Sequence, residues 1–318
     1  MAPTTRSWSP SSLLAQGAFD CRRARFSDLS AAARVCSLAF DDDVLFGRLI
    51  HPHRKSYPGD VDKYWYRRFI VDWWDPSHIF LVTTVRSKNG LAEIVTGVAH
   101  WSRMAPSWKE NYKAGWGYAW WDPSLQIFET PVLLAMLAQG KGSGIETCLH
   151  SSYPHFELIV GLLGWLSPNR AASAKDENII ERSYNYLDHI WTGQRSESWY
   201  LECLAVHPGY QNQGQGRALV MMGLWQAQRE GVACSVIAAD GKERFYQACG
   251  FDVGPVGRSG EGEGNPLKEV PGGLVFFKDK EGVVLPHREP GSWTYGHGVF
   301  DWDEWKKRVE TKQKSADD

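Results

Sequence analysis

The sequence lacks the features that mark secreted, disulfide-rich or membrane-spanning proteins. Its six cysteines are scattered, form no Cys-x-x-Cys pair and lie mostly in apolar stretches, which favours small buried residues in a reducing compartment. The start of the chain has no continuous apolar region of the kind that secretory signals carry. The most apolar run, 156–166, is shorter than the about 20 residues that span a bilayer. We therefore expect a cytoplasmic protein with no membrane partner.

Long basic runs are missing as well. The chain has 318 residues and a formal net charge of −2, and its Lys and Arg residues do not cluster. Proteins that bind nucleic acid need clustered positive charge, so we expect no nucleic-acid partner. Tryptophan, in contrast, is plentiful at 16 residues. Because disordered chains are poor in aromatic residues, most of this sequence is expected to fold.

Strand and helix patterns occur throughout 19–306, a region long enough for one large domain or two of ordinary size. A flexible N-terminus at 1–18 and a charged tail at 307–318 flank it. Residues 103–195 are rich in Trp and weakly periodic, and we interpret them as a helical insertion that ends in a helix over 177–191. A Gly-rich link at 258–271 is expected to be mobile. The strand patterns cover 19–25, 79–85, 94–101, 198–206, 234–239, 251–256 and 273–278, and further helix patterns cover 27–40, 64–73, 214–229 and 242–249.

One stretch combines a strand, a glycine-containing loop and a helix. The apolar strand ends at His207-Pro208, and the helix is entered through Gln211-Asn212-Gln213-Gly214-Gln215-Gly216. Such a loop directs several backbone N–H groups to one point at the positive end of a helix, which makes an anion site. The two glycines lack Cβ and let a phosphate approach the backbone, and Arg217 adds a charge-assisted contact. The glycines alone fit a tight strand-to-helix turn equally well.

Two familiar phosphate-binding loops are excluded in this stretch. No Gly-Lys-Ser/Thr follows the glycines, as a P-loop requires. Leu219 stands where a dinucleotide-binding fingerprint needs its third glycine. The anion site must therefore belong to another class.

With these residues the sequence resembles the GNAT superfamily of N-acetyltransferases. The family's acetyl-CoA signature is Gln/Arg-x-x-Gly-x-Gly/Ala after a strand that ends in Val-x-Pro, and Val206-His207-Pro208 and the loop from Gln211 to Gly216 match it. A second family motif, Tyr-x-x-x-Gly-Phe, is matched from Tyr246 to Phe251. The clear resemblance covers about 198–251. The arrangement looks like branches common in filamentous fungi, whose acceptors are often small molecules of secondary metabolism or detoxification.

The resemblance implies a fold and a cofactor site. It implies a single mixed α/β domain over 19–306 with a central mixed, mostly antiparallel twisted sheet flanked by helices. In that domain 198–256 would be the acetyl-CoA-binding core and 103–195 a large helical insertion. The strands at 198–206 and 234–239 would diverge and leave a wedge for pantetheine. Acetyl-CoA would be the co-substrate, and no metal is expected. The implied cofactor-binding residues are Leu204, Ala205, Val206, Gln211, Asn212, Gln213, Gly214, Gln215, Gly216 and Arg217.

Two residues are predicted to take part in catalysis. Tyr246 matches the tyrosine that protonates the leaving thiolate in many family members, although its ring would also suit simple packing under the sheet. Glu202 is the candidate general base, because it is the only carboxylate in an apolar strand and alternates onto the face of Leu204. A structural ion pair with an Arg of the insertion is the alternative for Glu202. Asp240, just after the next strand, is the reserve base.

The acceptor side is predicted less sharply. Phe40, Phe46 and the acidic triplet Asp41 to Asp43 would suit a cationic amine, but the triplet fits a solvated helix end as well. Five tryptophans of the insertion would roof a pocket or pack the insertion against the core, namely Trp108, Trp116, Trp120, Trp121 and Trp165. His51 and His53 lack nearby Cys or carboxylate partners, so a surface loop is favoured over a metal pair.

The resulting hypothesis is an acetyl-CoA-dependent N-acetyltransferase. It would move an acetyl group to the amine of a small molecule by direct transfer in a ternary complex, as a monomer or homodimer. A protein or peptide acetyltransferase, and a non-enzymatic acyl-CoA-binding or repurposed member of the fold, remain alternatives. The sequence does not decide between N- and O-transfer, and it does not identify the acceptor.

Overall fold

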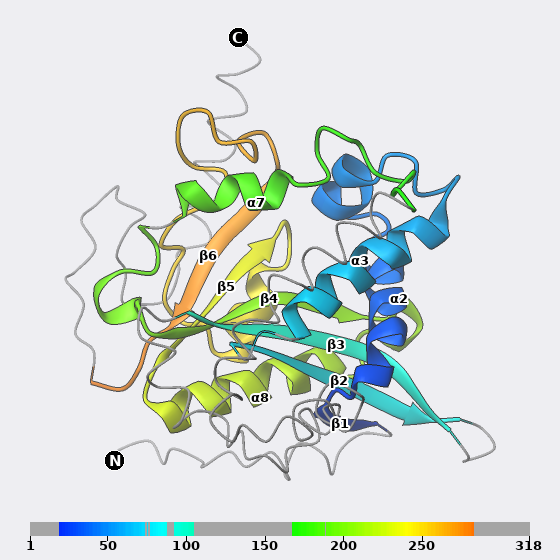
Figure 1. Cartoon of the computed structure of the whole chain (residues 1–318). Coiled ribbons are helices and arrows are strands. Elements are labelled where there is room, and N and C mark those ends of the chain that lie inside the picture. The colour runs from blue at the N-terminus through cyan, green and yellow to red at the C-terminus, as the bar shows by residue number, and fades with distance from the viewer. Residues whose placement is uncertain are drawn as a thin grey trace, which may run out of the picture.

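The computed structural model describes residues 19–282 except 74, 76, 88–91, 105–166 and 188 (Figure 1). The described strands form one six-stranded sheet in the order β1-β2-β3-β4-β5-β6. Neighbouring strands are antiparallel except for β4 and β5, which are parallel, so the predicted mixed and mostly antiparallel sheet is confirmed. The strands are β1 (Asp20–Arg23), β2 (His78–Arg86), β3 (Glu93–Met104), β4 (Ser198–Val206), β5 (Ala233–Ala239) and β6 (Gly272–Lys278).

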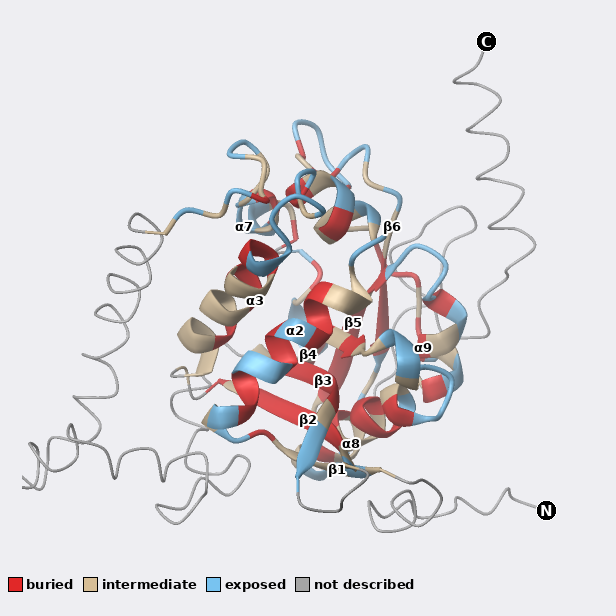
Figure 2. Cartoon of the chain, turned by 90° about the vertical axis from the view of Figure 1, so that its right-hand side faces the viewer, coloured by how far each residue is buried: buried red, intermediate tan, exposed pale blue. Residues whose placement is uncertain are grey.

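Helices cover both faces of this sheet. Figure 2 shows α2 and α3 on one side of the sheet and α8 and α9 on the other. The α-helices are α2 (Leu29–Ala39), α3 (Pro58–Trp73), α7 (Ile179–Ser183), α8 (Gln215–Glu230) and α9 (Glu243–Cys249). Shorter helical segments are η1 (Phe26–Asp28), the π-helix η2 (Val44–Ile50), and the 3₁₀ turns η4 (Tyr184–Tyr186), η5 (Gly193–Arg195) and η6 (Pro208–Tyr210).

The core is divided between the two faces by the alternation of strand side chains. Apolar residues at alternate positions pack under α2 and α3, and their neighbours pack under α8 and α9. The first set is Val82, Val98, Cys203 and Ala205, and the second is Leu81, Ala99, Trp101 and Leu201, which lies before a bulge that reverses the faces of β4. A glycine lets α8 approach the sheet closely, since a Cβ at Gly223 would lie 2.2 Å from Cζ2 of Trp101. Helix α8 is thereby held directly against β3.

The helix predicted over 177–191 is wrong in its extent. The α-helix covers only Ile179–Ser183, and 3₁₀ turns follow it. Ile179 packs in the cluster under α2 and α3, whereas Leu187 and Ile190 pack with Phe277 on the far side of the cavity described below. A straight helix would direct its apolar stripe to one cluster only. The chain therefore turns between them.

The strand predicted over 251–256 is also wrong. This segment makes only isolated bridges to β6, at Val253 with Phe277, and Pro255 has no N–H group to donate to a ladder. The following link, expected to be mobile, is held by hydrogen bonds. The guanidinium of Arg258 donates to the carbonyls of Gly272 and Lys268 at 3.0 and 3.1 Å, and the buried Asn265 donates to the carbonyl of Ser259 at 2.9 Å.

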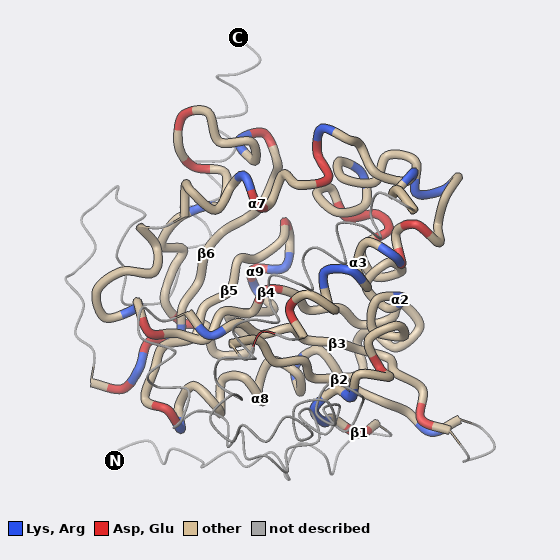
Figure 3. The backbone as a smooth tube through the Cα atoms, viewed as in Figure 1, with Lys and Arg blue, Asp and Glu red and all other residues tan. Residues whose placement is uncertain are grey.

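Several predicted segments lie outside the described residues. These are the N-terminus at 1–18, the tail at 307–318 and most of the insertion. β3 ends at Met104 and β4 begins at Ser198, so the insertion lies between the third and fourth strands, and its helical character stays a prediction. In Figure 3, positive and negative residues are interspersed along the described chain. None of the described helices combines the length and hydropathy that a membrane span requires.

Candidate active site

The sheet opens between β4 and β5. The two strands pair in parallel from Ser198 with Ala233 to Leu201 with Val236, and no pairing between them follows. β4 nevertheless continues to Val206, paired with β3 on its other edge. From Glu202 to Val206 the edge of β4 that faces β5 is therefore unpaired within the described sheet. A strand edge of this kind presents backbone N–H and C=O groups that an extended ligand can bind.

This opening leads into a cavity of about 790 Å³. β4, β5, the loop before α8, and helices α2, α3 and α9 all contribute to its wall. The cavity brings together nearly all of the predicted site residues, with Gln213 the exception. Those that line it are Glu202, Leu204, Ala205, Val206, Gln211, Asn212, Gly214, Gln215, Gly216, Arg217, Asp240 and Tyr246.

The loop before α8 presents free amide groups to the cavity. The first bond across the helix start runs from the N–H of Ala218 to the carbonyl of Gly214 at 3.0 Å. The N–H groups of Gln215, Gly216 and Arg217 come earlier in the helix and have no partner within it. Gly214 has a φ of 83°, a left-handed conformation that favours glycine, and a Cβ there would meet no atom within 4 Å. The helix start is therefore open toward the cavity, with the exposed Arg217 in its first turn.

Two glutamines of the loop have side chains that act within the protein. The side chain of Gln215 is 1% exposed, and its Oε1 accepts from the hydroxyls of Thr83 and Thr96 at 2.8 and 2.7 Å. Its Nε2 is buried and has no partner within the described structure. Gln211 donates from Nε2 to the carbonyl of Val206 at 3.0 Å, which ties the loop to the end of β4. Both residues can offer a ligand their backbone groups, and Gln215 can also offer Nε2.

Glu202 occupies an irregular position in β4. His100 pairs with Cys203 and Trp101 pairs with Leu201, so Glu202 is the extra residue of a β-bulge. Bulges re-aim a side chain and are common beside active sites. Half-buried and buried residues alternate along β4, but the bulge reverses its faces: Leu201 packs under α8 and α9, whereas Cys203 packs under α2 and α3. Leu204 packs against the cluster under α8 and α9, so the prediction that Glu202 lies on the face of Leu204 is wrong. The carboxylate of Glu202 is 18% exposed.

The partners of Glu202 are two histidines. Its Oε2 lies 3.6 Å from Nδ1 of His100, and its Oε1 lies 3.8 Å from Nδ1 of His78. The alternative, an ion pair between Glu202 and an Arg of the insertion, is not found among the described insertion residues 103–104, 167–187 and 189–195. Burial, and after it the charge of His78, lowers the pKa of His100 well below its usual range, so its imidazole is neutral at pH 7. A carboxylate beside two imidazoles can accept and pass on a proton.

Tyr246 reaches the same cavity from α9. Its side chain is 9% exposed and packs edge-on against Phe251, with ring centroids 6.0 Å apart. Burial, and then the nearby thiols of Cys203 and Cys249, raises the pKa of Tyr246 above its usual range. The hydroxyl therefore stays protonated at neutral pH, which suits a proton donor.

The acidic groups of the acceptor side have structural roles. The carboxylate of Asp43 accepts from the N–H groups of Leu45 and Phe46 at 2.9 and 2.8 Å, so it caps η2. Asp41 lies 3.5 Å from the guanidinium of Arg54 and does not line the cavity. Asp42 and Asp43 do line the cavity, so the triplet combines a helix-end role with a place in the cavity wall. Asp240, the reserve base, is exposed at the rim, whereas Glu202 lies deeper in the wall.

Aromatic rings form one end of the cavity. Phe40 stacks on Trp65 with centroids 5.2 Å apart, and Phe46 lies 4.8 Å from the same indole. Arg68 also lines the cavity and is paired with Glu181. The five tryptophans predicted to roof or pack this region lie in 105–166 and so outside the described residues.

The two histidines considered in the sequence do not share a site. His51 is 0% exposed, so its expected place in a surface loop is wrong, while His53 is exposed. Nδ1 of His51 donates to the carbonyl of Phe46 at 2.7 Å, and Nε2 accepts from Asn169 at 3.2 Å. Sequence reasoning missed His78 and His100 instead. The signal was weak, because β3 contains other polar residues besides His100, such as Thr96, Ser102 and Arg103.

Comparison with known proteins agrees with this geometry. Residues 174–253 match the family model described as the acetyltransferase (GNAT) domain. No curated protein sequence matches the chain. The matched segment runs from before α7 to the bridge at Val253, and it includes β4, the Gln211 loop, β5 and α9.

Three solved structures are similar to the chain at low sequence identity. One is described as histone acetyltransferase HPA2 and related acetyltransferase from Corynebacterium glutamicum, with 15% identity, a TM-score of 0.45, and coverage of 84% of this chain and 98% of that one. A GNAT family acetyltransferase from Brucella melitensis in complex with acetyl-CoA has 11% identity, a TM-score of 0.35 and coverage of 89% and 96%. The mosquito arylalkylamine N-acetyltransferase like 5b has 14% identity, a TM-score of 0.38 and coverage of 82% and 99%.

The family match, the strand order and the loop geometry identify the same part of the chain. Helix α8 and its preceding loop lie inside the matched segment, and so do Glu202 and Tyr246. Over residues 174–253 the chain matches an acetyltransferase (GNAT) domain, which supports an enzyme of the acyltransferase class.

Proposed function

We propose that this protein is an acetyl-CoA-dependent N-acetyltransferase that acts on the amine of a small molecule by direct transfer in a ternary complex. The observation that carries the proposal is that one cavity combines the free amides at the start of α8, the unpaired edge of β4, Glu202 and Tyr246. An anion site, a slot for an extended chain and a base with an acid are what acyl transfer from a CoA thioester requires.

The cofactor is proposed to lie along β4. Its diphosphate would accept hydrogen bonds from the N–H groups of Gln215, Gly216 and Arg217, supported by the positive end of the helix. Its pantetheine arm would pair with the open edge of β4 at Leu204 and Val206, and the thioester carbonyl would lie nearest the bulge at Glu202. Gln213 lies outside the cavity wall, so we assign it no direct contact.

The proposed reaction needs two proton transfers. The amine nitrogen attacks the thioester carbonyl carbon, a C–N bond forms, and the C–S bond then breaks. Glu202 accepts the proton that the attacking nitrogen loses, directly or through water. Tyr246 donates its hydroxyl proton to the leaving thiolate. The protonated state of Tyr246 and the half-buried carboxylate of Glu202 support these roles.

A small acceptor is favoured by the shape and chemistry of the cavity. Phe40, Phe46 and Trp65 form a ring-lined wall that suits an apolar or aromatic amine. The acidic groups next to them are engaged in capping and ion pairing, so we do not assign them to the acceptor. The fungal-type branch, the cytoplasmic location and a monomeric or homodimeric state remain parts of this proposal.

The test measures CoA release from acetyl-CoA over a panel of aromatic and aliphatic amines. Wild-type protein is expected to turn over at least one small amine, and Glu202→Gln to lower kcat by about 100-fold or more, because general base catalysis contributes about 100- to 10,000-fold. His53→Gln, which changes an exposed side chain that does not line the cavity, is the matched control and is expected to keep full turnover.

The alternatives predict different results in the same assay. Turnover of a lysine-containing peptide but of no small amine would indicate a protein acetyltransferase. Binding of CoA without turnover of any amine would indicate an acyl-CoA-binding protein. Equal turnover in Glu202→Gln and wild type would contradict the assignment of Glu202 as the base.

A further inference from the structure

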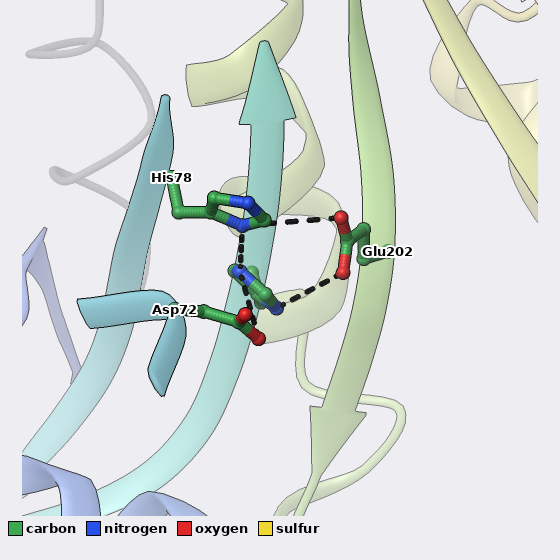
Figure 4. Close-up of side chains that lie close together, drawn as sticks. Asp72, His78 and Glu202 are labelled. Carbon is green, nitrogen blue, oxygen red and sulfur yellow. Dashed lines mark hydrogen bonds and ion pairs between the residues drawn. The ribbon is translucent and has the colours of Figure 1, made fainter. Parts of the chain in front are cut away.

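Four side chains that can bind a metal ion converge at the wall of the cavity. Asp72 lies near the end of α3, His78 at the start of β2, His100 in β3 and Glu202 in β4. One ligand atom from each residue lies within 4.8 Å of the ligand atoms of the other three. Figure 4 shows the side chains of Asp72, His78 and Glu202 pointing toward one another from these elements.

The register of the sheet brings the four residues together. Phe80 pairs with His100 across β2 and β3, and His78 lies two residues before Phe80 on the same face. The bulge in β4 turns Glu202 toward this pair. Asp72 reaches it from the helix that packs on this face of the sheet. The site is therefore fixed by regular elements rather than by a loop, which makes its geometry well defined.

The donor set fits a first-row divalent ion. Two imidazole nitrogens and two carboxylate oxygens form a mixed set of the kind that Zn²⁺ accepts. Zn²⁺ bonds of about 2.0 to 2.2 Å in tetrahedral geometry place ligand atoms about 3.4 Å apart. His78 Nδ1 and His100 Nε2 are joined by a hydrogen bond of 2.7 Å, which an ion would replace. The other separations are close to the tetrahedral value: 3.8 Å between His78 Nδ1 and Glu202 Oε1, and 3.9 Å between His100 Nε2 and Asp72 Oδ2. Glu202 Oε2 lies 3.6 Å from Nδ1 of His100, the nitrogen that faces away from His78.

The surroundings hold the ligands and leave a route for the ion. The ring of His100 stacks on Phe80 with centroids 4.2 Å apart and planes at 5°. Asp75 Oδ2 lies 4.0 Å from Nε2 of His78, the nitrogen that faces away from the cluster, which is the side on which outer partners of ligand histidines lie. His100 is 3% exposed, whereas the side chains of His78, Asp72 and Glu202 are 13 to 20% exposed. Solvent thus reaches one side of the cluster.

The two carboxylates of the cluster favour the binding of a cation. Two carboxylates lie within 4.8 Å of each other, and in a partly buried site their repulsion is weakly screened. The nearby guanidinium of Arg68 is paired with Glu181. A divalent ion placed between the four ligand atoms would balance both carboxylates and use both imidazoles.

We propose that Asp72, His78, His100 and Glu202 form a binding site for a divalent transition-metal ion, with Zn²⁺ as the best fit. This departs from the expectation of a metal-free protein that the sequence suggested. Ion binding does not depend on the proposed function, but its consequence does. An ion held by Glu202 occupies the lone pair that the proposed base needs, so the ion would act as an inhibitor of acetyl transfer.

The test is a titration of the full chain with Zn²⁺ alone, with neither CoA nor amine present. Tag-free protein is stripped with a chelator, and binding is followed by calorimetry and by competition with a chromogenic chelator. We expect one Zn²⁺ per chain. Replacing a residue that only contacts a metal ligand typically weakens metal binding by about 10- to 100-fold. His78→Gln and Asp72→Asn replace the ligands themselves, so we expect Zn²⁺ affinity to fall by at least that much. His53→Gln removes an exposed histidine elsewhere and is expected to bind as wild type does.

A second measurement needs no variant. Co²⁺ added to the stripped wild-type protein is expected to give the intense visible absorption of a four-coordinate site, and Zn²⁺ is expected to abolish it. The absence of stoichiometric binding of Zn²⁺ and Co²⁺ to the wild type would overturn the proposal, whatever the enzyme's activity. Equal affinity in wild type, His78→Gln and Asp72→Asn would overturn it as well, since the ion would then be bound elsewhere.

Discussion

At the scale of single residues, the roles of Tyr246 and Gln215 follow from what surrounds their polar atoms. Tyr246 is packed by Phe251 and lies near the thiols of Cys203 and Cys249, so its hydroxyl has little access to water. Gln215 is buried at the start of α8 and bonded to two threonines of the sheet. The first environment sets a protonation state, and the second fixes the position of a helix end.

Replacing Tyr246 by Phe removes the proposed proton donor and keeps the ring. Loss of a general acid usually lowers kcat by about 100-fold or more. We expect a smaller fall, of about tenfold, because a thiolate is a fair leaving group. The measurement is steady-state CoA release at saturating acetyl-CoA. Tyr57→Phe is the control, since Tyr57 is 38% exposed and lies outside the cavity wall. Full activity in Tyr246→Phe would contradict this role and would show that solvent protonates the thiolate.

The raised pKa of Tyr246 also predicts a pH dependence. An ordinary tyrosine loses its proton near pH 10. Because burial, followed by the two thiols, raises the pKa of Tyr246 in the folded protein, the donor is still protonated at that pH. We therefore expect no loss of kcat attributable to this hydroxyl between pH 8 and about 10. A fall in kcat over this range that is absent from Tyr246→Phe would show that the hydroxyl titrates normally.

Gln215→Leu tests the anchor at the start of α8. The change leaves the buried hydroxyls of Thr83 and Thr96 without the acceptor that they share. An unsatisfied buried polar group costs about 1 to 3 kcal/mol, and we expect the free energy of unfolding to fall by about that amount. Urea unfolding measures it. Gln228→Leu on the same helix is exposed and is expected to change the stability by less than about 0.5 kcal/mol.

At the scale of elements, the start of α8 is where local structure and ligand binding meet. Gly214 has a left-handed backbone, and a Cβ there would point into open space beside the free amides. Gly193 has the same kind of backbone, with φ of 58°, and also has nothing within 4 Å of a Cβ. Unlike Gly214, it does not line the cavity. The two glycines form a matched pair.

Gly214→Ala and Gly193→Ala are expected to destabilise the fold equally and to differ in CoA binding. An alanine in the left-handed region costs about 1 to 2 kcal/mol, which thermal unfolding would detect in both variants. Only the Cβ at position 214 would push a diphosphate away from the amides. Losing one charge-assisted hydrogen bond is worth about 1.5 kcal/mol, or about tenfold in Kd. Equal CoA affinity in both variants would exclude the diphosphate from this helix end.

Elements with a local signature were predicted well from the sequence. β2, β3, β4 and α8 are marked by alternation, helical periodicity or capping glycines within the element itself, and the structure places them close to the expected bounds. The segment 177–191 failed for a non-local reason. Ile179 and Ile190 belong to different apolar clusters, and no pattern within the segment reveals that division. The segment 251–256 looked like a strand, but its proline and its position beside β6 allow only isolated bridges.

At the scale of the whole molecule, the site depends on contacts between distant parts of the chain. Glu202 was predicted as the only carboxylate of an apolar strand, and it does line the cavity. Its partners His78 and His100 are more than 100 residues earlier in the sequence and reach it through strand register and a bulge. Neither feature is visible in the composition or spacing of one sequence. The cofactor loop is local and was found, whereas the histidine and carboxylate cluster is non-local and was missed.

The overlap of the cluster with the cavity predicts that zinc and catalysis compete for Glu202. Micromolar Zn²⁺ is expected to inhibit acetyl transfer by wild-type protein, because a coordinated carboxylate no longer accepts a proton, and added chelator is expected to restore the rate. His78→Gln, compared with its own rate without zinc, is expected to need about 10- to 100-fold more Zn²⁺ for the same fractional inhibition. The thiol of released CoA also binds zinc. Because both proteins release CoA, this effect is present in both measurements. Equal sensitivity of the two proteins would separate zinc inhibition from the cluster.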